Sequence, residues 1–190
     1  MTHTHNTGTS RQRRRAGTTL VLAAASGGLL AAAMAGSPTA RADDPYTDIV
    51  NYVQNSITIA EDEYSAAGTD FSTAGDTNEG LIASLAGFDN LFVSSTDYTL
   101  LGLTAAATDT DFSTYGGVFF INDTGPTTAA GQAADASTDL TSASAFFSDA
   151  TSSFTGGEYF NGVDYLLLSG YEDILAGQAD TLAGLFSLGF

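Results

Sequence analysis

The chain contains no cysteine, tryptophan or lysine, and beyond Arg41 it contains no arginine or histidine either. Without cysteine it can form neither a disulfide nor a thiol nucleophile. Without a later histidine or lysine, the body of the chain cannot build a Ser-His-Asp or Ser-Lys catalytic group, nor a zinc site of the usual His/Cys kind. Carboxylate chemistry is the main catalytic option that this composition leaves, and we expect no cofactor.

All 22 acidic residues lie between Asp43 and Asp180, so the body of the chain has a formal side-chain charge of −22. Because lysine and arginine drive phosphate binding, we expect no nucleic-acid partner, and anionic lipid surfaces should repel this body. A basic partner surface would be attracted instead. The acidic residues are scattered among normal apolar content and abundant Phe and Tyr, which indicates a folded domain.

The first 42 residues have the pattern of a secretory signal peptide. A basic stretch ending at Arg15 precedes an apolar run over 16–36, and the run is followed by the triplet Ala40-Arg41-Ala42. Small residues at Ala40 and Ala42 are typical of a signal-peptidase site, so we expect cleavage after Ala42 and no membrane span afterwards. The alternative is an uncleaved anchor, because about 20 apolar residues can cross a bilayer. We expect the general export route and a secreted or cell-envelope location; a twin-arginine route is the other option.

The body, 43–190, is expected to be a single acidic domain that is mainly helical. Apolar residues recur every three or four positions over 45–66, and an Ala-rich run over 128–154 predicts a long helix. Four polar residues are each followed three positions later by Asp or Glu, a pattern typical of helix starts: Asp76, Ser94, Thr155 and Ser169. The Gly- and Thr-rich segment 109–126 predicts a loop, with the apolar run 118–121 as a short strand.

An internal repeat favours a helical bundle of two related halves. Residues 87–102 resemble residues 162–177 at a constant offset of 75, within broader segments at about 76–108 and 155–186. Such a duplication predicts two similar helical units joined by the Gly/Thr-rich segment.

Asp123 is the one candidate catalytic residue. The triplet Asp123-Thr124-Gly125 follows an apolar run and resembles the active-site triplet of aspartic proteases, in which two aspartates share a proton and activate water. Asn122 and Pro126 depart from that family's pattern, and no second triplet exists. Activity would therefore require a symmetric dimer, and the alternative is an ordinary Pro-Gly turn.

Asp109 and Asp111 are candidate metal ligands, because Asp109-x-Asp111-x-Ser113 matches the start of a calcium loop. Thr114 and Phe120 occupy the positions where an EF-hand has glycine and glutamate, so this is not an EF-hand. The alternative interpretation is solvated acidic surface.

The leader ending in Ala-Arg-Ala-Asp-Asp-Pro-Tyr, the run 87–92 and the run 176–180 resemble small uncharacterised exported proteins of mycobacteria and related actinobacteria. The resemblance implies export past the inner membrane and supplies no site residues. We expect a secreted or envelope protein that acts by binding, without catalysis, to a protein, an envelope component or an apolar ligand. The alternatives are a carboxylate-dependent hydrolase using Asp123 and a calcium-stabilised structural envelope protein.

Overall fold

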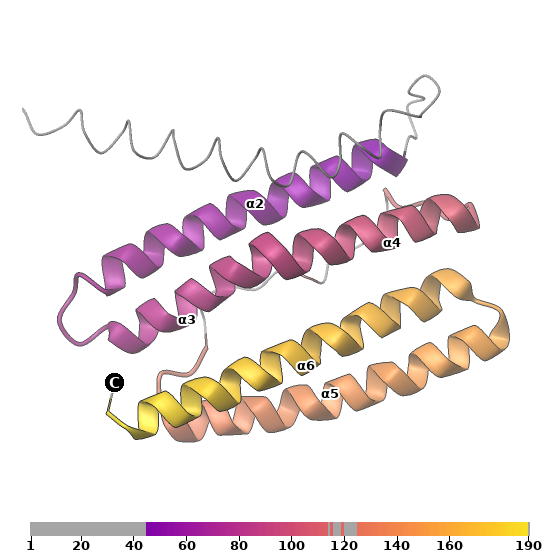
Figure 1. Ribbon diagram of the computed structural model, residues 1–190. Helices are drawn as coiled ribbons and strands as arrows, with labels where there is room; N and C mark the ends of the chain where they lie inside the picture. The colour runs from indigo at the N-terminus through magenta and orange to yellow at the C-terminus, as the bar shows by residue number, and fades with distance from the viewer. Residues whose placement is uncertain (1–44, 114, 116–118, 120–124, 190) are drawn as a thin grey trace, which may run out of the picture. The chain divides into compact units, whose positions relative to one another are not determined.

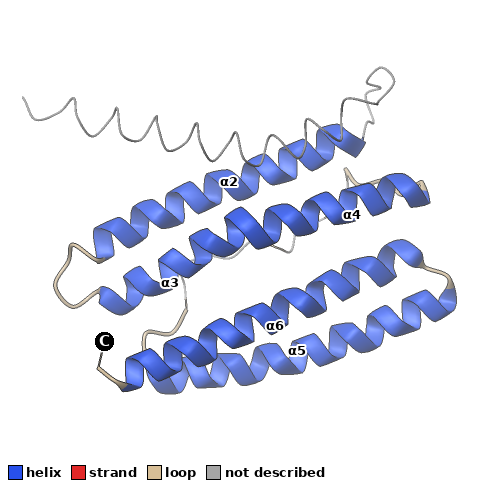
Figure 2. Cartoon of the chain, in the orientation of Figure 1, coloured by secondary structure: helices blue, strands red, loops and turns tan. Residues whose placement is uncertain are grey.

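The computed structural model describes residues 45–113, 115, 119 and 125–189, which belong to one compact unit spanning Asp43–Phe190. This part of the chain is mainly helical, as the sequence predicted, and contains no strand (Figures 1 and 2). Its elements are α2 (Pro45–Asp70), α3 (Thr77–Phe88), a π-helix η1 (Asp89–Ser94), α4 (Ser95–Thr108), α5 (Ala129–Gly156) and α6 (Tyr159–Ser187). The predicted leader and most of the predicted strand over 118–121 lie outside the described residues.

The helices form two antiparallel pairs (Figure 1). Helix α2 packs along the continuous rod α3–η1–α4, and α5 packs along α6. Helix α6 also contacts α4, so the order across this unit is α2, then α3–η1–α4, then α6, then α5. Among the described residues, buried apolar side chains from Ile49 to Leu182 form a core within the compact unit Asp43–Phe190, so we expect residues 43–190 to fold as a unit.

Small residues at seven-residue intervals bring α5 and α6 close together. Ala136, Ala143 and Ala150 are buried on α5, and Ser169 and Ala176 are buried on α6. The Ser169 hydroxyl donates a hydrogen bond of 2.8 Å to the backbone carbonyl of Ala143, which requires the two backbones to lie nearly in contact. Repeats of seven residues keep one face of each helix turned toward its neighbour along the whole pair.

Two of the four predicted helix starts are correct in position: Asp76 precedes α3 and Ser94 precedes α4, although neither side chain makes a capping hydrogen bond. Ser94 has helical backbone angles and is also the last residue of η1, so the rod continues through it. The other two predictions are wrong, because Thr155 lies inside α5 and Ser169 lies inside α6. Ser94 and Ser169 are buried and donate to backbone carbonyls outside their own helix, of Phe119 and Ala143, so these two serines serve helix packing. The real break between α5 and α6 is Gly157, in the left-handed conformation with φ 80°.

The two copies of the internal repeat lie in the second member of each helix pair. Gly87 and Gly162 are both buried, and an added Cβ would meet the ring of Tyr64 at 3.0 Å or that of Phe154 at 2.6 Å. Further along, Gly102 packs against Ile49, whereas Gly177, its counterpart, faces open space. The two copies of the repeat therefore pack alike near their first glycine, which lies against an aromatic ring in both, and differ near their last glycine.

No helix in the described ranges is both long enough and apolar enough to cross a membrane.

Candidate functional site

A buried seam of carboxylates and tyrosines joins the rod α3–η1–α4 to α6. Asp89, the first residue of the π-helix, is 1% exposed, and its Oδ1 accepts a hydrogen bond of 2.7 Å from Nε2 of Gln178 on α6. The other oxygen, Oδ2, is buried without a hydrogen-bond partner. Burial raises the pKa of Asp89 to about 6, while the Gln178 hydrogen bond lowers it. π-Helical turns are frequent at functional positions, and this one places Asp89 and Asn90 together in the interior.

Asp97, two turns further along the rod, is the second buried carboxylate of this seam. It is 9% exposed, and desolvation by burial raises its pKa to about 7. Basic residues stop at Arg41, so nothing in the body of the chain can neutralise a buried carboxylate with a cation. A buried carboxylate without a cation is costly to keep charged, because it has lost its water. Its pKa therefore rises, and it binds a proton near neutral pH.

Tyrosines occupy the middle of the same seam. Tyr98 is fully buried, and its hydroxyl accepts a 3.1 Å hydrogen bond from the backbone N–H of Phe119. Tyr171 on α6 shares a hydrogen bond with Ser94 and lies edge-on to Phe119, with ring centroids 5.6 Å apart. Burial raises the pKa of Tyr98 and of Tyr171 above the usual range, so both are neutral hydrogen-bonding groups.

The segment after α4 closes one side of this seam. The Tyr115 hydroxyl donates a hydrogen bond of 2.8 Å to Oδ1 of Asp164 on α6, and the Tyr52 hydroxyl from α2 donates to the backbone carbonyl of Tyr115. Burial raises the pKa of Asp164, while this hydrogen bond lowers it. The seam therefore links α2, the rod, the connecting segment and α6 through polar groups that can carry or lose a proton.

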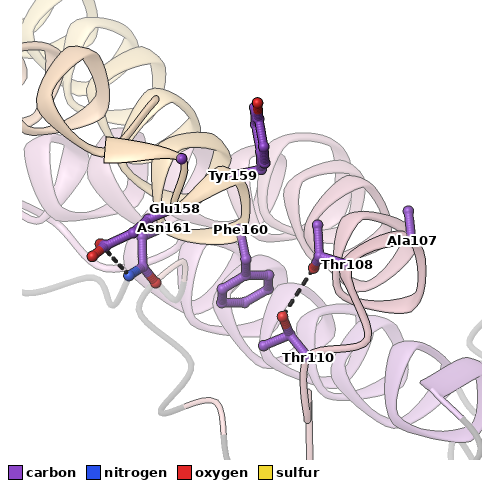
Figure 3. Close-up of a pocket in the computed structure, with 8 residues that line it drawn as sticks. Ala107, Thr108, Thr110, Glu158, Tyr159, Phe160 and Asn161 are labelled. Carbon is purple, nitrogen blue, oxygen red and sulfur yellow. Dashed lines mark hydrogen bonds between the residues drawn. The ribbon is translucent and has the colours of Figure 1, made fainter. Parts of the chain in front are cut away.

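A shallow depression lies where the end of α4 meets the turn between α5 and α6. Its volume is about 560 Å³ and its lining includes Thr108, Thr110, Tyr159 and Phe160. Figure 3 shows Phe160 directed toward Thr110 and Tyr159 pointing away. Four of its polar side chains are paired with each other: Thr108 shares a 2.9 Å hydrogen bond with Thr110, and Asn161 donates one of 3.1 Å to Glu158. The depression thus offers no convergent set of free polar groups to a ligand.

A row of exposed apolar side chains runs along α5 beside its contact with α6, each four residues after a buried alanine. Leu140, Phe147 and Phe154 recur every seven residues and are 52%, 59% and 37% exposed. We call these three residues the α5 row. Solvent-exposed apolar rows of this size on a folded domain mark binding surfaces more often than chance.

Of the candidate site residues from the sequence, the structure describes Asp109 and Asp111. Asp109 ends α4 in the left-handed conformation with φ 55° and is exposed. Asp111 is exposed, and its Oδ1 accepts hydrogen bonds from the backbone N–H of Ser113 at 3.0 Å and from its hydroxyl at 2.6 Å, which makes a local turn. Asp123, Ala40 and Ala42 lie outside the described residues. Within the described ranges, no three metal-binding side chains are grouped.

Sequence reasoning missed the seam and the α5 row. The seam had a usable signal, because a chain with no basic residue after Arg41 must leave any buried carboxylate without a cation. The α5 row had one too, in the seven-residue spacing of Leu140, Phe147 and Phe154. Which carboxylates are buried depends on contacts between helices far apart in sequence.

Comparison of the chain with protein-family models, with curated proteins and with solved structures found no match in any of the three.

Proposed function

We propose that this protein is an exported, non-enzymatic binding domain of the cell envelope or the surrounding medium. The observation that supports binding most directly is the α5 row, in which large apolar side chains are exposed to solvent. Among the described elements, α5 makes substantial contact with α6 alone. Leaving such side chains in water costs roughly 25 cal/mol per Å² of apolar surface, and a partner that covers them recovers this free energy.

The acidic body supports the kind of partner. A formal charge of −22 with no basic residue makes the domain strongly negative overall, which draws basic surfaces in and keeps other acidic surfaces away. Export is supported by the basic stretch, the apolar run and the Ala40-Arg41-Ala42 triplet.

The proposal is tested by producing the full chain in an actinobacterial host. We expect the medium or envelope fraction to contain a chain whose first residue is Asp43, and replacing Ala40 and Ala42 with bulky residues should block this processing. A photo-crosslinking amino acid at position 147 should then give a product of one defined mass. The matched control is position 51, exposed on α2.

Two results would contradict the proposal. One is a chain that keeps Met1 and stays in the cytoplasm. The other is a position 147 that gives no more crosslinked product than position 51.

A further inference from the structure

The chemistry of the face around the α5 row defines what it can bind. This face is poor in charge: Asp149 is the one exposed carboxylate among the described residues of α5, Asp135 and Asp139 are half-buried, and the other exposed residues are Ser, Thr, Ala, Gly156 and the row itself. Interface centres are depleted in charged residues in the same way. On a domain whose other faces carry many carboxylates, this is a surface that a partner can cover without burying negative charge.

The threonine hydroxyl groups of α5 are already satisfied. Thr141 donates a 2.9 Å hydrogen bond to the carbonyl of Ser137, and Thr151 donates one of 3.0 Å to the carbonyl of Phe147. Thr138 and Thr155 make the same bond to the carbonyl four residues earlier. Because these donors need no new partner when water leaves, covering the face costs little unpaired hydrogen-bonding capacity.

Carboxylates lie at one end of the α5 row. The hydrogen bond between Ser169 and Ala143 fixes the antiparallel register of α5 and α6. One turn from that contact brings Asp173 level with Leu140, and Asp180, one heptad later on α6, lies beyond the Leu140 end of the row. Both aspartates are exposed, whereas exposed apolar side chains, Leu166 and Tyr159, lie level with the rest of the row. The surface thus combines an apolar row of seven-residue period with two carboxylates at its Leu140 end.

From this combination we infer that the α5 row is the docking site for a helix of a partner protein, with an apolar residue in each heptad and lysine or arginine at the end that meets Asp173 and Asp180. The inference rests on the proposed binding function and names the class of partner. Apolar residues of such a helix would cover Leu140, Phe147 and Phe154, while its basic residues would face Asp173 and Asp180. A second copy of this chain is a poorer occupant, because two bodies of charge −22 repel each other and neither supplies a basic residue.

The length of α5 sets the expected size of the contact. Its 28 residues extend for about 42 Å at 1.5 Å per residue, which is room for about three to four heptads of a partner helix. A strip of that length and about 10 Å wide is small compared with the roughly 800 Å² per partner of a standard interface. We therefore expect micromolar affinity that depends on the row and on Asp173 and Asp180.

The test uses a synthetic helical peptide about three heptads long, with leucine at the a and d positions and lysine at the flanking positions. Residues 43–190 are titrated with it at physiological ionic strength by isothermal calorimetry. A second peptide keeps the leucines and replaces every lysine with glutamate. We expect the lysine peptide to bind at least about 10-fold more tightly than the glutamate peptide.

Variants of the domain locate the site. Phe147→Ser should weaken binding of the lysine peptide at least about 10-fold, and Asp173→Asn combined with Asp180→Asn should weaken it about 3- to 10-fold. The matched control is Phe92→Ser, which removes a side chain of similar exposure, 52%, from the π-helix. The control should bind within about 2-fold of the unchanged domain. Circular dichroism checks that all variants keep their helix content.

Three outcomes would overturn the inference. The first is no binding of the lysine peptide to the unchanged domain. The second is equal weakening by Phe147→Ser and Phe92→Ser, which would mean non-specific attraction. The third is a dimer in sedimentation velocity that Phe147→Ser abolishes, which would make a second copy the occupant. If position 147 still crosslinks to a defined partner that carries no basic helix, the inference fails while the proposed binding function stands.

Discussion

Replacing Asp97 with asparagine should stabilise the folded domain at neutral and alkaline pH and leave its stability unchanged at acidic pH. Asp97 is 9% exposed, and its pKa is raised by burial from 3.8 to about 7. Because the pKa in the folded state lies above that in the unfolded state, the folded state holds the proton more tightly between these two values. The contribution of Asp97 to stability is therefore full below about pH 4 and is lost as pH rises toward 7.

The size of the effect follows from the same shift. Each pKa unit corresponds to 1.36 kcal/mol, so an ionised Asp97 costs at most about 4 kcal/mol above pH 7. Asparagine has nearly the same shape and no charge, and we expect it to recover about 2–4 kcal/mol at about pH 8. For a domain of this size that corresponds to a rise in Tm of about 5–15 °C. At about pH 4 the two proteins should unfold with free energies within about 0.5 kcal/mol.

Denaturant unfolding followed by circular dichroism at several pH values between about 4 and 8 measures this difference. The matched control is Asp62→Asn, which removes one negative charge from an exposed position on α2. Both variants relieve the general repulsion of the acidic body equally, so only the burial of Asp97 distinguishes them. If Asp97→Asn is no more stabilising than Asp62→Asn at about pH 8, or if it destabilises at every pH, the reasoning about the seam is wrong.

Three further predictions concern packing and charge. Gly102→Ala should destabilise the domain by about 1–3 kcal/mol in thermal unfolding, because the new Cβ would collide with Ile49. The control Gly170→Ala has open space around the new Cβ and should be neutral or stabilising by up to about 1 kcal/mol in the same assay. Ser169→Val should cost about 1–3 kcal/mol in denaturant unfolding, because Ser169 lies against the Ala143 backbone; an unchanged midpoint would mean that α5 and α6 are further apart. Raising NaCl from about 0.01 M to about 1 M should raise the Tm in calorimetry, because the Debye length falls from about 30 Å to about 3 Å and screens the charge of −22; a constant or falling Tm would contradict this.

The helical class could be predicted because local patterns determine it. The apolar period over 45–66 predicted α2, which spans Pro45–Asp70, and the Ala-rich run over 128–154 predicted α5, which spans Ala129–Gly156. These helices start and end on local signals: proline at the first position of α2, and a Thr128 side chain that accepts from the backbone N–H of Gly131 at 3.2 Å.

The functional surfaces could not be predicted because they depend on which helices meet. A serine followed by an acidic residue three positions later is typical of a helix start, yet Ser169 has the same neighbours because a small residue is needed where α6 touches α5. Asp89 and Gln178 are 89 positions apart, and only the tertiary fold brings their side chains within 2.7 Å. Asp109 and Asp111 are close in sequence, as the start of a calcium loop requires. In the structure, Asp109 ends α4 and Asp111 accepts hydrogen bonds from Ser113 in a local turn.

The most direct test of the account is chemical-shift mapping of isotope-labelled 43–190 titrated with the lysine-bearing helical peptide. We predict that the largest amide shifts fall on α5 around Leu140, Phe147 and Phe154 and on α6 around Asp173 and Asp180, with little change on α2 and α4. Shifts spread evenly over the acidic surface, or centred on the Phe88–Phe92 ring pair of the rod, would contradict the claim that the α5 row is the binding surface.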